Sequence, residues 1–301
     1  MSFASSDVEL NPPAFPPEIE RYIFIFAAER DRGTAALLLR VAHRVRIWIE
    51  PLLYHIVDTS YPAVYDAFMR TAIDNPDALR IGVRGLMVSN LYFEDDKALA
   101  KFYEAIALCK NLERFTIVQP LTLPSLLLPI LADLRILRLV IGLDKLLTPT
   151  IPTPEAAQSL CHVTHLEVFG SLFGHSALEE AIQEALIAMP SLTHLAYTHP
   201  PDDLDAWLEK LPRLQVFLIA GASSPRDYLL EDEYRDQRIV VTYWERWDEG
   251  ASYSEGYWDR AERFLEKKRL REIPETEFRA VYDGPELPPS PPEDDPDEHE
   301  L

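Results

Sequence analysis

The sequence predicts an α/β protein in which a module of short N-terminal helices precedes a longer array of alternating strands and helices. Residues 15–54 have the apolar spacing of short helices. A short apolar unit of strand type then recurs in steps of 22 or 29 residues. Helix-like stretches separate these units, and strands joined through helices pair in parallel. We therefore expect a parallel sheet with its helices packed against it.

The N-terminal module, residues 15–54, begins with a proline pair that can open a helix, because proline costs little in a first helical turn. A second helix is expected at 35–41, and a third run contains Val45, Trp48, Ile49 and Leu52, with Pro51 marking a break or a new turn. So much apolar surface exceeds what a unit of this size can bury alone. Either the rest of the chain or another protein should cover it. The first helix carries its apolar stripe at Ile19, Tyr22, Ile23, Phe26 and Ala27, with Phe24 and Ile25 off that stripe.

The segment FPPEI, followed by an Ile-Phe pair and then by VAHRVRIW, resembles the F-box. This family consists of small helical modules that dock on the Skp adaptor of cullin–RING ubiquitin ligases. The continuation EPLLYHIV is similar to the divergent F-box-like proteins of mushroom-forming fungi. The resemblance implies a Skp adaptor as partner and assigns these residues to the adaptor interface or its support: Pro16, Pro17, Ile19, Ile23, Phe24, Val41 and Trp48.

Residues 55–242 contain the repeated unit, of the form apolar-x-x-apolar-x-apolar. The pattern resembles a degenerate leucine-rich repeat, which implies a leucine-rich-repeat-like α/β solenoid with a parallel sheet. Two weaker strand candidates, 55–58 and 238–242, flank the array. The six clear units are 83–88, 112–117, 134–139, 163–168, 192–197 and 214–219.

Helix-like stretches precede the strand units, at 98–108, 154–160, 177–189 and 204–211. The acidic pairs Asp95-Asp96 and Asp202-Asp203 stand at helix starts. Carboxylates favour this position because they accept hydrogen bonds from free backbone N–H groups and complement the helix dipole. We interpret both pairs as helix caps.

Strand residues alternate between the two faces of a sheet, so the two later apolar positions of each unit should point into the core. The residues beside them are expected on an open concave surface, a candidate site for a target protein. This surface would be polar in its middle and apolar at one end. Its residues are Arg114, Thr116, Ile136, Arg138, His165, Glu167, His194, Ala196, Val216 and Leu218.

The C-terminal part, 243–283, begins with closely spaced aromatic residues and continues as a helix expected at 255–271. We favour a cap that seals the end of the solenoid, and an aromatic recognition patch is the alternative. The buried side of the helix should contain Trp258, Ala261, Phe264 and Leu265. Residues 1–14 and the acidic, proline-rich tail 284–301 are expected to be disordered.

The net charge of −21 argues against nucleic acid or an anionic membrane as partner, because both are densely negative. Two cysteines are too few for a disulfide framework and favour a reducing, intracellular location, cytoplasmic or nuclear. The N-terminus shows no signal peptide, and prolines and charges interrupt the most apolar stretch, 121–143.

No catalytic constellation is found, and we expect no cofactor and no resident metal. The strongest candidate group is Cys161, His162 and His165, but no second cluster supplies zinc ligands at a recognisable spacing. His165 and His194 occupy equivalent positions in neighbouring units and should lie side by side. We favour ordinary packed or solvated histidines, with a metal site or a pH-responsive pair as the alternative.

The preferred function is a substrate-recognition subunit of an SCF-type cullin–RING ubiquitin ligase, with an unidentified target protein. The alternative is a non-catalytic leucine-rich-repeat scaffold whose N-terminal helices only cap the solenoid. That alternative predicts that Ile19, Ile23, Phe24 and Trp48 are buried against the first repeat. An enzyme is the least favoured class.

Overall fold

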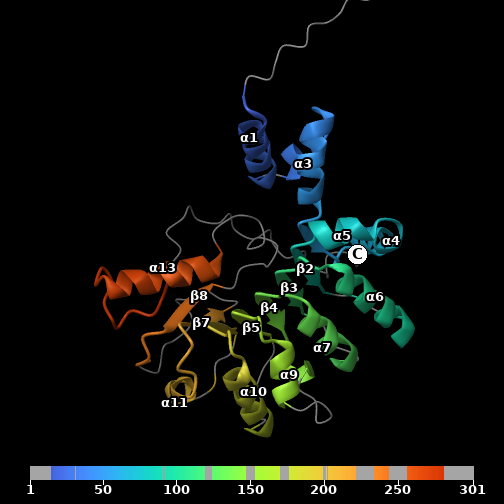
Figure 1. Ribbon diagram of the computed structural model, residues 1–301. Coiled ribbons are helices and arrows are strands. Elements are labelled where there is room, and N and C mark those ends of the chain that lie inside the picture. The colour runs from blue at the N-terminus through green and yellow to red at the C-terminus, as the bar shows by residue number, and fades with distance from the viewer. Residues whose placement is uncertain are drawn as a thin grey trace, which may run out of the picture.

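The computed structural model describes residues 15–30, 32–89, 91, 93–118, 124–146, 153–169, 176–198, 201, 203–221, 234–243 and 256–280. Within these residues, eight parallel strands form one sheet, and each strand pairs with the next one in the chain (Figure 1). The predicted parallel sheet is therefore confirmed, including strands at both weaker candidates. The strands are β1 Ile56–Asp58, β2 Gly85–Val88, β3 Arg114–Ile117, β4 Arg138–Ile141, β5 His165–Val168, β6 His194–Tyr197, β7 Val216–Gly221 and β8 Ile239–Tyr243.

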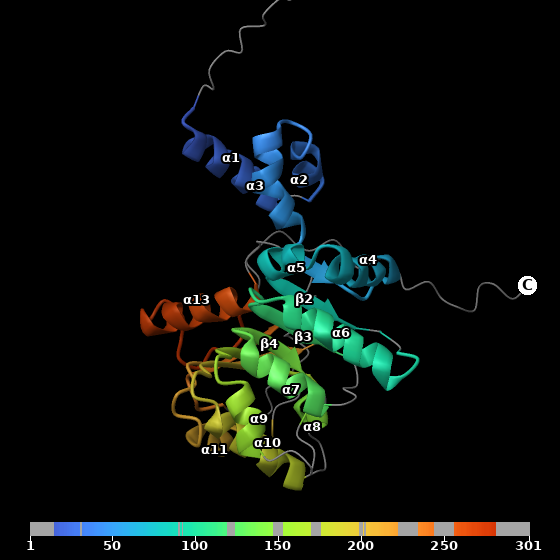
Figure 2. The same ribbon diagram turned by 45° about the vertical axis from the view of Figure 1, so that its right-hand side comes forward.

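The main core lies between one face of this sheet and the helices that connect the strands (Figures 1 and 2). The register places equivalent apolar residues side by side, and two rows of them are at most 2% exposed. The prediction that the two later apolar positions point into the core is confirmed for five of the six units. In the unit 134–139 it is wrong by two residues, because Leu139 and Ile141 take these positions and Leu137 is 43% exposed. One row is Leu86, Phe115, Leu139, Leu166, Leu195 and Phe217, and the other is Val88, Ile117, Ile141, Val168, Tyr197 and Ile219.

Helices alternate with the strands, and their starts follow from local chemistry. Asp95 caps α6 by accepting a hydrogen bond from Ala98 N at 2.7 Å. Asp203 caps α11 in the same way by accepting a hydrogen bond from Ala206 N at 3.2 Å. The predicted capping role is confirmed for these two acids. The helices are α4 Pro62–Asp74, α5 Pro76–Gly82, α6 Asp96–Leu108, α7 Pro124–Asp133, α8 Leu143–Leu146, α9 Thr153–Ser159, α10 Ser176–Ala188 and α11 Leu204–Glu209.

The opposite face of the sheet is covered by α13 Tyr257–Arg269, which lies apart from the other helices in Figure 1. Its apolar side is the predicted one and packs on the last three strands. This contact forms a second hydrophobic core, distinct from the main one. Its residues are Ala196, Val216, Leu218, Ala220, Val240, Tyr257, Trp258, Ala261, Phe264, Leu265 and Ala280.

The expectation of an open concave surface is therefore wrong for most of its residues. At β6 and β7 the reason is α13, which removes Ala196, Val216 and Leu218 from solvent. Ile136 belongs to the main core instead, because the repeated unit lies at 136–141 rather than at the predicted 134–139. Arg114, Arg138 and His165 keep partial exposure. The residues of the expected surface that are buried are Thr116, Ile136, Glu167, His194, Ala196, Val216 and Leu218.

The C-terminal segment also closes the edge of the sheet at β8. After α13 the chain returns, and Val241 N donates to Phe278 O at 2.7 Å while Ala280 N donates to Val241 O at 2.9 Å. These bonds occupy backbone groups that an edge strand would otherwise leave unpaired. The described part of the C-terminal segment thus contributes a short bridge at the edge of the sheet and a helix over its face. Tyr243 ends β8, and the predicted aromatic residues Trp244, Trp247 and Tyr253 lie outside the described residues.

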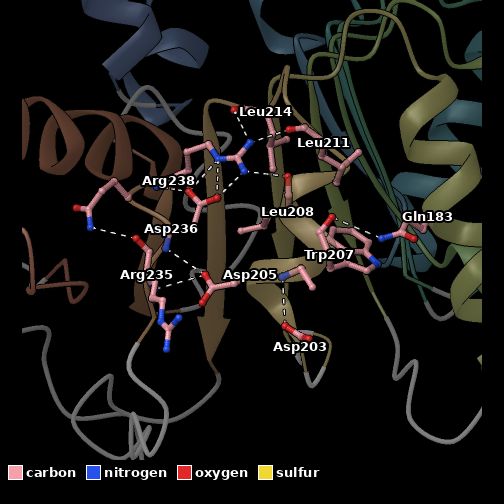
Figure 3. A network of polar contacts seen from close by, with 12 residues as sticks. Gln183, Asp203, Asp205, Trp207, Leu208, Leu211, Leu214, Arg235, Asp236 and Arg238 are labelled. Carbon is pink, nitrogen blue, oxygen red and sulfur yellow. Dashed lines mark hydrogen bonds and ion pairs between the residues drawn. The ribbon is translucent and has the colours of Figure 1, made fainter.

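Strand β8 is tied to the preceding helix by Arg238, at the centre of the polar network in Figure 3. Its guanidinium donates to Leu211 O at 2.7 Å and to Leu208 O at 2.9 Å. It also donates to Asp236 at 2.9 Å. The leucine carbonyls end α11 and the turn after it, where helix carbonyls lack intrahelical partners. Burial would raise the pKa of Asp236, but its hydrogen bonds and charge interaction with Arg238 outweigh burial and lower it.

Arg238→Ala is expected to destabilise the protein by about 2–4 kcal/mol, since several partly buried acceptors lose their donor together. Urea denaturation measures the loss, with the exposed Gln237→Ala as matched control. Because the pKa of Asp236 is lowered in the folded protein, this carboxylate is protonated at a higher pH in the unfolded chain than in the folded protein. The stabilising contribution of the ionised Asp236 carboxylate is present above its unfolded pKa of about 4 and is lost as the pH falls through its folded pKa. Equal stability of Arg238→Ala and wild type would contradict this role.

Candidate functional site

The N-terminal helices form a unit with its own small core. Helices α1 Pro17–Arg30, α2 Arg32–Leu38 and α3 His43–Leu53 stand beside the β1 end of the sheet in Figures 1 and 2. Pro51 lies inside α3 rather than at a break, and the helix ends two residues later. The fully buried residues of this core are Ala28, Ala35, Val45 and Ile49.

The residues assigned to the adaptor interface divide into an outer and an inner group. Phe24 and Trp48 are half-buried and pack against the small core, with ring centroids 6.5 Å apart. They support the helices rather than forming their surface. The outer group is exposed to solvent and consists of Pro16, Pro17, Ile19, Ile23 and Val41.

An exposed apolar stripe runs along α1, and we call it the α1 stripe. Ile19, Tyr22, Ile23 and Phe26 are between 46% and 68% exposed. Their spacing of i, i+3, i+4 and i+7 places them on one side of the helix, and the rings of Tyr22 and Phe26 stack at 6.3 Å. A contiguous apolar patch of this kind marks a binding surface more often than isolated apolar residues do.

Tyr22 and Phe26 are not among the positions that the F-box resemblance assigns to the adaptor interface, although both belong to the predicted apolar stripe. An apolar stripe normally faces the core of its own protein. Here the core-facing positions are taken by Phe24, Ile25 and Ala28 instead. The signal was the presence of apolar residues on more than one side of the helix, which leaves one side without cover.

Two contacts determine how the α1 stripe is presented. Arg44 of α3 donates to both carboxylate oxygens of Glu20, at 2.7 and 3.0 Å, and these hydrogen bonds lower the pKa of Glu20. A paired guanidinium and carboxylate fix the angle between helices more specifically than one point contact. The unit joins the sheet through α3 and α5, where a Cβ at Gly82 would lie 2.8 Å from Tyr54 Cβ. Glycine therefore permits the close approach of the two helices.

A second group of polar side chains lies on the covered face of the sheet, on one row of the register. The row contains Arg114, Arg138, His165 and His194 from consecutive strands. The two imidazoles stack with centroids 4.0 Å apart and an interplanar angle of 12°. The predicted side-by-side placement of the histidines is confirmed, whereas His162 is exposed and Cys161 is a free thiol.

Helix α13 encloses the histidine pair. The Trp258 ring meets both imidazoles edge-on, with centroids 5.2 Å from His165 and 5.7 Å from His194. Glu262 Oε1 lies 3.0 Å from His194 Nε2. Tyr257, which precedes Trp258 in α13, donates its hydroxyl hydrogen to the buried carboxylate of Glu167. None of these α13 partners was identified from the sequence.

Burial dominates the protonation of both histidines. Burial, followed by the charges of His194, Arg138 and Arg114, lowers the pKa of His165 to about 3. Burial also lowers the pKa of His194, although its contact with Glu262 acts in the opposite direction. Both rings are therefore neutral near pH 7. Burial also raises the pKa of the Cys109 thiol to about 12, so Cys109 is not a reactive nucleophile.

These features define an α/β protein with an eight-stranded parallel sheet and a separate N-terminal helical unit whose outer surface is apolar. Comparison of the chain with protein-family models and with curated protein sequences found no match. Across the described ranges, no helix is long and apolar enough to cross a membrane.

Proposed function

We propose that the chain is the substrate-recognition subunit of an SCF-type cullin–RING ubiquitin ligase. In this proposal the F-box-like module 15–54 binds the Skp adaptor, and the leucine-rich-repeat-like solenoid 55–242 holds the target protein. The observation that carries it is the α1 stripe, an exposed apolar surface on a helical unit with its own core. The resemblance of this segment to the F-box adds the identity of the partner.

The alternative of a simple scaffold cap has less support. A cap would bury Ile19 and Ile23 against the first repeat, yet they are 49% and 46% exposed. Phe24 and Trp48 pack within the N-terminal unit itself. The α1 stripe thus remains open to a second protein.

Helix α13 restricts where a target could bind. It covers β6 to β8 on the face that the sequence suggested for target recognition. In the row formed by Arg114, Arg138, His165 and His194, the two arginines lie on β3 and β4, away from the strands that α13 covers. Both keep partial exposure. We therefore place target recognition at this end, where two guanidiniums suit a target with carboxylates.

Co-purification of the full chain with a Skp adaptor tests the proposal. The wild-type chain and an Ile73→Asp control should both retain the adaptor. Ile73 lies on α4, outside the N-terminal unit, and is 80% exposed. Failure of the folded wild-type chain to bind any Skp adaptor would refute the proposed function.

A further inference from the structure

The strongest unassigned cluster joins the sheet to α13 through His165, His194 and Glu262. One ligand atom from each of these residues lies within 4.8 Å of the other two. They come from β5, β6 and α13, so only the folded chain assembles them. Imidazole nitrogens and a carboxylate oxygen are the donors found in many zinc sites.

The histidine Nδ1 atoms are engaged by the preceding threonines. Thr164 Oγ1 lies 2.8 Å from His165 Nδ1, and Thr193 Oγ1 lies 2.8 Å from His194 Nδ1. Each hydroxyl also donates to a backbone carbonyl. Thr164 donates to Leu137 O at 3.1 Å, and Thr193 donates to Thr164 O at 3.2 Å. A hydroxyl has a single hydrogen. Because that hydrogen is donated to the carbonyl, the threonine oxygen accepts a hydrogen bond from the imidazole Nδ1–H. This tautomer leaves the Nε2 lone pair of each ring free to bind a ligand.

The buried His194 Nε2 atom faces the Glu262 carboxylate without a hydrogen bond to it. His194 is only 5% exposed, and within the described ranges its buried Nε2 makes no hydrogen bond. Glu262 Oε1 is 3.0 Å away but does not have hydrogen-bond geometry. A lone pair beside a carboxylate is unfavourable unless a cation lies between them, and a buried polar atom without a partner is costly.

We propose that His165 Nε2, His194 Nε2 and a Glu262 carboxylate oxygen bind one divalent transition-metal ion, for which zinc is the best match. Zinc takes such ligands at about 2.0–2.2 Å, which requires ligand atoms about 3.4 Å apart. The stacked rings need to turn toward each other to reach this separation. Glu262 is about half exposed, so water can complete the coordination.

Some charges around the cluster favour a bound cation and others disfavour it. Arg114 and Arg138 on the same row disfavour a cation, while Glu262 and the buried Glu167 favour it. The threonine hydroxyls hold the rings in the way that outer-shell groups orient metal-bound histidines. The bound ion would fasten α13 to β5 and β6.

Zinc titration of the full-length, chelator-treated chain by calorimetry tests the site. The expected result is one tight zinc per chain, with affinity reduced about 100-fold or more in Glu262→Gln and in His194→Gln. Loss of an outer-shell partner costs about 10–100-fold, so Thr193→Val should fall in that range. Glu266→Gln, one turn along α13 and exposed, is the matched control and should bind as wild type does.

Circular dichroism of each variant establishes that the chain is folded, and Glu262→Gln decides the case if His194→Gln does not fold. Binding of Co²⁺ gives a second readout, because its absorption spectrum reports nitrogen and oxygen ligands. The proposal is overturned if the folded wild-type chain binds no zinc stoichiometrically. It is also overturned if Glu262→Gln binds zinc as tightly as wild type, because the metal would then be held elsewhere, for example by the exposed His162.

Discussion

Ile23→Asp should abolish co-purification of the chain with a Skp adaptor, lowering the affinity about 100-fold or more. If the α1 stripe is the docking surface, this change places a carboxylate in the apolar centre of the interface. An unpaired charge buried at an interface costs several kcal/mol, and about 2.8 kcal/mol corresponds to a 100-fold loss. Ile23 is 46% exposed in the free chain, so the stability of the chain itself should change by only about 0.5 kcal/mol.

Two further variants sharpen this result. Tyr22→Ala and Phe26→Ala should each weaken adaptor binding, because aromatic anchors contribute strongly to interfaces. The Ile73→Asp control adds the same charge at another exposed isoleucine and should bind normally. If Ile23→Asp and wild type bind the adaptor equally well, the α1 stripe is not the docking surface.

Trp258→Ala is expected to destabilise the protein by about 3–5 kcal/mol, the range for truncating a large buried aromatic side chain. Trp258 is 6% exposed and packs against both imidazoles and the second core. Its loss should detach α13 from β6 to β8 before the main core unfolds, because the two cores are separate. Hydrogen exchange should show faster exchange in α13 than in β2 to β4.

Leu270→Ala is the matched control for this prediction. Leu270 follows α13 directly and is 60% exposed, so its truncation should change the stability by about 0.5 kcal/mol or less. A loss below about 1 kcal/mol in Trp258→Ala would show that α13 contributes little to the fold.

The strand positions could be predicted because they depend on local pattern. Each unit has two core-facing apolar residues with one residue between them, such as Phe115 and Ile117, and this period of two places both on the same face. The capping acids Asp95 and Asp203 were likewise identifiable from their place at helix starts. These features need only residues a few positions apart.

The covered face could not be predicted in the same way. Alternation separates the residues of a strand into two sets, but it does not say what lies over each set. Glu167 meets Tyr257 across 90 residues of sequence, and no local pattern encodes that contact. One signal was present: Val216 and Leu218 form an apolar area, and α13 has an apolar side that needs a receiving surface. The two apolar surfaces match, but they lie about 40 residues apart in the sequence, and no local pattern pairs them.

Local sequence pattern was enough to predict the alternation of strands and helices, the core-facing positions of five of the six units and the side-by-side placement of His165 and His194. These follow from short-range periodicity and from the parallel register of neighbouring units. Three further features depend on tertiary packing: α13 covers the sheet, Glu262 reaches the histidine pair and the α1 stripe remains exposed. Each of these outcomes depends on which apolar surfaces meet after the chain has folded, and burial is a property of that meeting rather than of any segment alone.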